Sequence, residues 1–140
     1  MNPLPTFDGV HIGDELPVLE LPTVDRTMLA LFAGASGDHN RVHIDIDFAR
    51  RAGLPDVFAH GMLGMAWLGR LLTDWAPQAQ LRHFEARFQS ITQLGHVVRC
   101  SGRVVEKLHE QGERRVRLLI DSTNQHGQVT IAGTAVVALP

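Results

Sequence analysis

Residues that can handle protons and water stand close together in one short segment of this chain. Asp38, Asn40 and His43 lie within seven consecutive residues, Gly37-Asp38-His39-Asn40-Arg41-Val42-His43, and His60-Gly61 follows 17 residues later. Carboxylates and imidazoles are the usual general acids and bases, and two residues five apart in a loop can converge on one water molecule. The segment therefore predicts a site that moves water and protons beside a polarised carbonyl.

Gly61 is expected to act through its backbone. It stands at the head of the longest apolar segment, His60 to Trp75. The first N–H groups of a helix have no partner inside the helix and lie at its positive end, so they suit a developing oxyanion. Glycine lets a carbonyl approach closely. His60 precedes this helix and is interpreted mainly as its N-terminal cap, while it stays a candidate site residue.

Simpler interpretations compete with these assignments. Asp38 has the setting of a turn aspartate that binds its own backbone, and His43 alone fits a buried core histidine. Asn40 either fixes the loop or contacts substrate, and His39 is expected to be exposed. A metal site is a further alternative, with the ligand set Asp38, His39, His43, Asp45 and Asp47. The β-branched residues between these positions oppose the helix that would align the two histidines, so no metal is expected.

The elements that must position the site can be read from periodicity. Apolar residues at helical spacing predict a helix from an N-cap at Thr23 to a C-cap at Gly37, directly before Asp38. A short strand is expected over Glu15 to Leu21 and a helical turn over Phe48 to Ala52. The segment from His60 to Trp75 is apolar almost all round, which predicts a buried helix. Its three glycines predict close packing of its backbone.

After Pro77 the period changes to two. Four successive segments alternate apolar and polar residues, and Gln111-Gly112 and His126-Gly127 mark tight connections, so an antiparallel sheet is expected. The last segment, Val129 to Leu139, has small or apolar residues on both faces, which predicts a central strand or one covered by another subunit. The implied fold class is α+β, a curved antiparallel sheet around one long helix at about residues 60–75.

Composition limits the remaining choices. The 140 residues suit one domain spanning 1–140, and a net charge of −2 offers no basic surface for nucleic acid. The apolar segment is shorter than the about 20 residues that span a bilayer, so no membrane insertion is expected. One cysteine and the absence of a signal-peptide pattern favour the cytoplasm.

The compound motif resembles that of the MaoC-like acyl dehydratases, the family of (R)-specific enoyl-CoA hydratases with a hot dog fold. The likeness rests on Gly37 to His43, Ala49, and His60-Gly61-Met62-Leu63, in that order and spacing. It implies a hydro-lyase of fatty acid metabolism that adds or removes water across an enoyl thioester. It further implies that Asp38 and His43 trade protons with substrate, that the Gly61 N–H receives the thioester oxygen, and that Asn40 belongs to the site.

The resemblance also implies partners and leaves alternatives. The substrate is expected to be an acyl thioester of coenzyme A or acyl carrier protein, with no other cofactor. A homodimer paired edge to edge is expected, and a heterodimeric dehydratase is the alternative. A hot dog thioesterase is a second alternative, although the helix from Gly61 to Leu72 lacks the carboxylate it would need.

Two further features bear on substrate class. Arg41 stands where the family usually has proline, so it either pairs with an acidic group on an unusual substrate or contacts a neighbouring subunit. Twelve of the 13 basic residues are arginine. Eight of them could supply a phosphate clamp, and no single one is assigned to it: Arg50, Arg51, Arg82, Arg99, Arg103, Arg114, Arg115 and Arg117.

Overall fold

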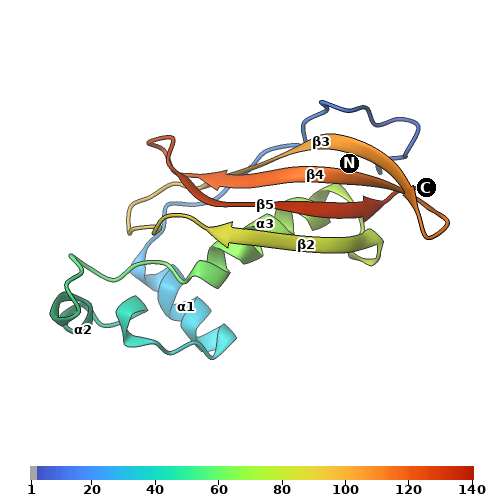
Figure 1. Ribbon diagram of the computed structural model, residues 1–140. Helices are drawn as coiled ribbons and strands as arrows, with labels where there is room; N and C mark the ends of the chain where they lie inside the picture. The colour runs from blue at the N-terminus through green and yellow to red at the C-terminus, as the bar shows by residue number, and fades with distance from the viewer. Residues whose placement is uncertain (1–2) are drawn as a thin grey trace.

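The computed structural model describes residues 3–140 as a curved antiparallel sheet with one long helix against one face (Figure 1). The strands are β1 Leu19–Glu20, β2 Leu81–Phe88, β3 Arg99–Glu110, β4 Glu113–Thr123 and β5 Val129–Ala138. The helices are α1 Arg26–Ser36, α2 Ile46–Arg51 and α3 Gly61–Trp75, with 3₁₀ turns at Arg41–His43 and Gln78–Gln80. Both α1 and α2 lie beyond the sheet, near the start of α3.

The sheet has the strand order β1-β3-β4-β5-β2, and every pairing is antiparallel. The four predicted strands are confirmed, and β5 is central, between β4 and β2, as its two apolar faces indicated. At the β3–β4 connection Gln111 and Gly112 have φ of 51° and 75°. This left-handed pair matches the right-handed twist of a two-residue hairpin, so the sequence signal for a tight turn was correct.

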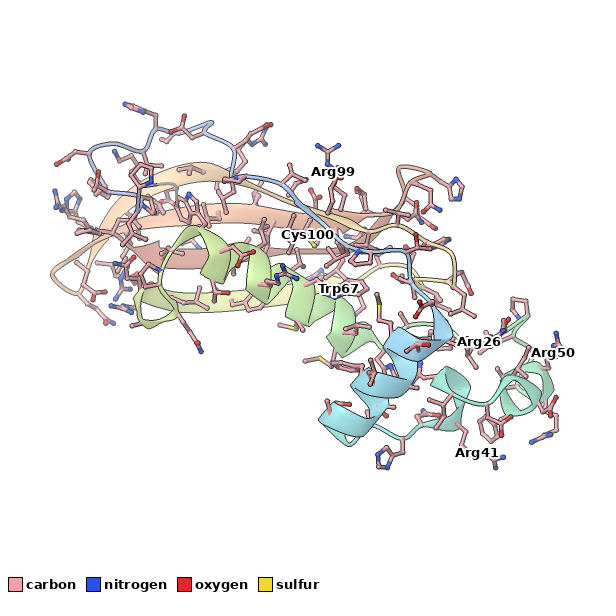
Figure 2. All side chains as sticks on the ribbon, turned by 180° about the vertical axis from the view of Figure 1, so that it is seen from behind. Arg26, Arg41, Arg50, Trp67, Arg99 and Cys100 are labelled. Atoms are coloured by element: carbon pink, nitrogen blue, oxygen red, sulfur yellow. The ribbon has the colours of Figure 1, made fainter. Side chains whose placement is uncertain are left out.

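The predicted central helix is confirmed as α3, but only one of its sides is buried. Trp67, Leu68 and Leu71 face the sheet, and Figure 2 shows Trp67 and Cys100 between the two layers. Each fully buried leucine contributes about 1.5–3 kcal/mol relative to an exposed one. Met62, on the other side of α3, is 56% exposed. The helix is therefore not buried on all sides within this chain, although its apolar sequence predicted that it would be.

Two of the three helix glycines allow the close packing that the sequence predicted. A Cβ on Gly64 would lie 2.6 Å from the Ile131 side chain, and one on Gly61 would lie 3.1 Å from the Phe88 ring. A Cβ on Gly69 would make ordinary contact, at 3.6 Å from Phe84. The start of α3 therefore packs tightly against the end of β2 and the beginning of β5.

Several predicted boundaries shift because aspartates cap the helices. The Asp25 carboxylate accepts the Met28 N–H at 2.8 Å, so Asp25 is the N-cap of α1 and the predicted cap at Thr23 is wrong. Gly37, with φ of 76°, ends α1 as predicted. Asp45 accepts N–H groups of the next turn, so α2 begins before Phe48.

The strand predicted over Glu15–Leu21 shortens to β1. It pairs with β3, and a single bridge joins Glu15 to Arg103.

Most of the arginines considered for a phosphate clamp pair with carboxylates of their own chain. Glu113 is held by Arg82 at 2.7 Å and by Arg115 at 2.7 Å, and these guanidinium groups lower its pKa to about 2. The arginines that form such ion pairs are Arg82, Arg99, Arg114, Arg115 and Arg117. They join strands and the N-terminal segment at the surface. Among residues 3–140, none of the helices is both long and apolar enough to cross a membrane.

Candidate active site

The loop after α1 and the start of α3 bring three titratable side chains together. One nitrogen or oxygen of each of Asp38, His43 and His60 lies within 4.8 Å of those of the other two. Asp38 is exposed, whereas His43 is only 8% exposed and His60 only 1% exposed. The structure thus places a solvent-facing carboxylate beside two buried imidazoles, and it brings Asp38 and His43 together as the sequence predicted.

The hydrogen bond of His43 fixes its tautomer. Its Nδ1 lies 2.7 Å from the Phe58 carbonyl oxygen, which only accepts, so Nδ1 carries the proton. In the neutral ring Nε2 then has a free lone pair. The Phe58 ring also packs edge-on against His43, with centroids 4.7 Å apart. The side chain is held in a form that can take a proton at Nε2 and return it.

Asp38 and Asn40 shape the loop through their own backbone. The Asp38 carboxylate accepts the Asn40 N–H at 3.2 Å, and the Asn40 side chain accepts the Val42 N–H at 3.2 Å. The turn role considered for Asp38 is therefore present, and it leaves one carboxylate oxygen for other partners. Asn40 caps the 3₁₀ turn Arg41–His43, which supports its loop-fixing interpretation.

His60 occupies the N-cap position of α3, yet within the described residues its ring makes no capping hydrogen bond. Its Nε2–H donates instead to the Asp38 carbonyl oxygen at 3.1 Å, and its ring stacks on His43 with centroids 4.0 Å apart. Burial lowers the pKa of His60, the proximity of His43 adds to this, and the bond to Asp38 opposes it. The sequence therefore placed His60 correctly but gave it the wrong contact.

A cavity of about 250 Å³ opens beside the first residue of α3. His60 and Gly61 form one part of its wall, and the rest is largely apolar. The other lining residues include Phe58, Phe88, Ile91 and Ile131. Sequence reasoning missed these four, because they come from a loop and from strands that only the fold brings together. The glycines of α3 were the available signal, since they predicted a close approach at this end of the helix.

Arg41 does not point into this site. Its guanidinium binds the Asp45 carboxylate at 2.6 Å and lies over the Phe48 ring, 4.9 Å from the centroid. Figure 2 shows Arg41 at the outer side of the α2 region. Within this chain Arg41 thus pairs in its own loop, and its pairing with a substrate acid or a neighbouring subunit stays a prediction. The four-residue spacing of Arg41 and Asp45 was the sequence signal for the pair within the loop.

The donor set fits a metal ion poorly. The planes of the stacked His43 and His60 rings are only 27° apart, so their in-plane lone pairs run side by side and do not converge. The proton on His60 Nε2 is used in the bond to Asp38. In the ligand set considered from the sequence, His39 is exposed and Asp45 is engaged with Arg41 and the start of α2.

Several known proteins share the sequence pattern and the fold of this chain. A family model described as a MaoC-like domain matches residues 11–125. The unliganded R-hydratase PhaJ1 from Pseudomonas aeruginosa superimposes with a TM-score of 0.82, at 27% identity over 96% of this chain and 85% of that one. A chain of the ChsH1-ChsH2 complex from Mycobacterium tuberculosis shares the fold, with a TM-score of 0.79 at 24% identity over 93% of this chain and 98% of that one.

A curated relative is much longer than this chain. The β subunit of fatty acid synthase from Saccharomyces cerevisiae is 26% identical over 132 residues, which cover 86% of this chain but 6% of that protein. This chain therefore corresponds to a small part of that relative.

Proposed function

This chain belongs to the MaoC-like dehydratase domain family and has its hot dog fold, and from this we propose that it hydrates enoyl thioesters and dehydrates 3-hydroxyacyl thioesters. The family and fold inferred from the motif are confirmed. One observation carries the proposal to this chain. The Asp38 carboxylate and the His43 imidazole meet beside the α3 N-terminus, where Gly61 begins the helix.

The geometry supports a concerted use of these groups. A water held between Asp38 and His43 donates its two protons toward the carboxylate and toward the lone pair of Nε2. As the water oxygen bonds to the β-carbon, one of the two groups takes its proton, and the electrons of the double bond move toward the thioester oxygen. The Gly61 N–H and the positive end of α3 stabilise that negative charge. Return of a proton to the α-carbon restores the carbonyl.

This scheme balances with the chain's own residues. A proton and a hydroxide are added, and no electron leaves or enters the substrate. The thioester itself acidifies the α-carbon, so no further cofactor is needed beyond the coenzyme A or acyl carrier protein that carries the acyl group. We extend the (R) configuration named for PhaJ1 to the product of this chain.

Hydration of crotonyl-CoA tests the proposal. The wild-type protein is expected to remove the enoyl absorbance, and Asp38→Asn is expected to lower the rate by at least about a hundredfold, in the range for a general base. Asp47→Asn is the matched control, because Asp47 is an exposed aspartate of α2. Chromatography against both 3-hydroxybutyryl-CoA enantiomers identifies the configuration. An inactive wild type, alone and with candidate partner subunits, contradicts the proposal.

The thioesterase alternative is less well supported by the position of the acidic residue on α3. Asp74 lies in the last turn, about 20 Å along the helix from Gly61, and pairs with Arg70 at 3.6 Å. A carboxylate there is too far away to activate attack at a carbonyl bound at Gly61. Release of free coenzyme A without loss of the double bond would favour the thioesterase.

The quaternary state proposed is a homodimer paired through β2. This strand forms one edge of the sheet, and Phe88 at its end and Met62 on α3 are both more than half exposed. An unpaired strand edge beside exposed apolar side chains is a ready surface for a second copy. Light scattering after size-exclusion chromatography is expected to give twice the chain mass. Activity that appears only with a second polypeptide would support the heterodimer, a complex of two different chains like the one named ChsH1-ChsH2.

A further inference from the structure

His60 touches three separate parts of the site at once. Its Nε2–H holds the Asp38 carbonyl at 3.1 Å, its ring stacks on His43 at 4.0 Å, and its backbone begins α3 beside Gly61. We propose that His60 is a positioning residue that holds the Asp38 loop and the His43 ring in one geometry for proton transfer. The inference rests on the proposed function and adds a role for a residue whose position alone suggested a helix cap.

The two simpler roles for His60 do not account for its contacts. A cap would accept a helix N–H, and among residues 3–140 the His60 ring accepts none. A residue that only fills space would be apolar, whereas the buried Nδ1 of His60 lacks a hydrogen-bond partner in the described part of the chain. Leaving a polar atom unpaired costs stability, so a histidine here is explained better by what Nε2 and the ring do.

The neutral form of His60 is the one that suits this role. The titratable groups that face it are Asp38 and His43, and α1 contributes the Phe32 ring, edge-on with centroids 4.9 Å apart. Burial lowers the pKa of His60, which keeps the ring uncharged while His43 takes up and releases a proton. Two charged imidazoles stacked face to face would repel one another.

Three substitutions separate the contacts that His60 makes. His60→Gln keeps an N–H donor for the Asp38 carbonyl but loses the stacked ring. His60→Phe keeps a ring but loses the donor, and it removes the unpaired Nδ1. His60→Ala loses both. His39→Gln is the matched control, because His39 is an exposed histidine of the same loop.

Steady-state hydration of crotonyl-CoA measures the effect. We expect His60→Ala to lower kcat about ten- to a hundredfold, because small displacements of reacting groups have effects of that size, with KM changed less than about threefold. The Gln and Phe variants should each recover part of kcat. The pH–rate profile of His60→Ala should differ from that of the wild type, since water then reaches the face of His43 that His60 covers.

Thermal melting separates positioning from folding. His60→Phe is expected to melt at or above the wild-type temperature while its kcat stays below that of the wild type. Two results would overturn the inference. One is a kcat and a pH profile that match the wild type in all three variants, and the other is a kcat that is lowered only in variants whose melting temperature is also lowered.

A readout without turnover keeps this test apart from that of the proposed function. Nitrogen-15 histidine NMR of the wild-type protein should show a neutral His60 at pH 8, with its proton on Nε2, and a pKa below that of an ordinary histidine. His60→Gln should change the titration midpoint of the His43 signal, and His39→Gln should not. A His60 that carries its proton on Nδ1, or a His43 signal unchanged in His60→Gln, refutes the positioning role even if the protein proves inactive on enoyl thioesters.

Discussion

Replacing Gly61 with proline removes the proposed oxyanion donor and leaves the helix intact. Gly61 is the first residue of α3, where the N–H has no partner in the helix and proline is well tolerated. His60, just before it, has φ of −56° and ψ of 135°, the extended form that a residue before proline favours. Gly61→Pro therefore deletes one N–H at little cost to the fold.

The expected loss is that of a single oxyanion donor, about 2.7–4 kcal/mol of transition-state stabilisation, or about 10²–10³ in kcat. Crowding is a separate effect, since a new Cβ would lie 3.1 Å from the Phe88 ring. That ring is 54% exposed and has room to shift. Gly61→Ala adds the same Cβ and keeps the N–H, so it is expected to retain more activity than Gly61→Pro, and any loss it shows measures crowding alone.

The assay is the initial rate of crotonyl-CoA hydration, with circular dichroism melts to confirm that both variants fold. If Gly61→Pro and Gly61→Ala have the same kcat, the Gly61 N–H is not the donor and the oxyanion assignment is wrong. In that case, any loss of activity that the two variants share is explained by crowding against Phe88.

Three further predictions concern stability and reactivity. The pKa of Glu113 is about 2 in the fold, against 4.5 for a free side chain, so the ionised Glu113 stabilises the folded state above pH 4.5 and this effect is lost as the pH falls toward 2. The urea midpoint of unfolding should therefore drop between pH 4.5 and 2, and the drop should be smaller in Glu113→Gln. Burial raises the pKa of Cys100 to about 12, so its thiol should react with Ellman's reagent at pH 8 only after unfolding in urea. A Cβ on Gly133 would overlap the Glu85 carbonyl oxygen in the paired strand, so Gly133→Ala should lower the free energy of unfolding by about 2–3 kcal/mol. The control Gly34→Ala, on α1, meets open space and should raise it by up to about 1 kcal/mol, both measured by urea titration.

Local patterns predicted most of the elements but not all of their ends. The period-two alternation after Pro77 located the four long strands, because each strand carries its own two faces in sequence. The start of α1 was misplaced because Thr23 and Asp25 are both good caps. The choice depends on which side chain reaches the free N–H of Met28, and the backbone at Asp25 provides that geometry.

The sequence by itself determined the order of helices and strands and the identity of Asp38, His43 and Gly61 as site candidates. Motif spacing and periodicity are local properties, and they survive without knowledge of packing. They also sufficed to recognise the family, since the motif has a fixed order from Gly37 to Leu63.

Only the tertiary structure decided what His60 contacts and what lines the cavity. The His60 ring meets Asp38, 22 residues earlier in the chain, and Phe88 reaches Gly61 from the end of β2. Such contacts depend on how separate segments pack against one another, and no local pattern encodes the direction in which a buried side chain turns. The same packing settled the tautomer of His43, because its proton is fixed by the carbonyl of Phe58.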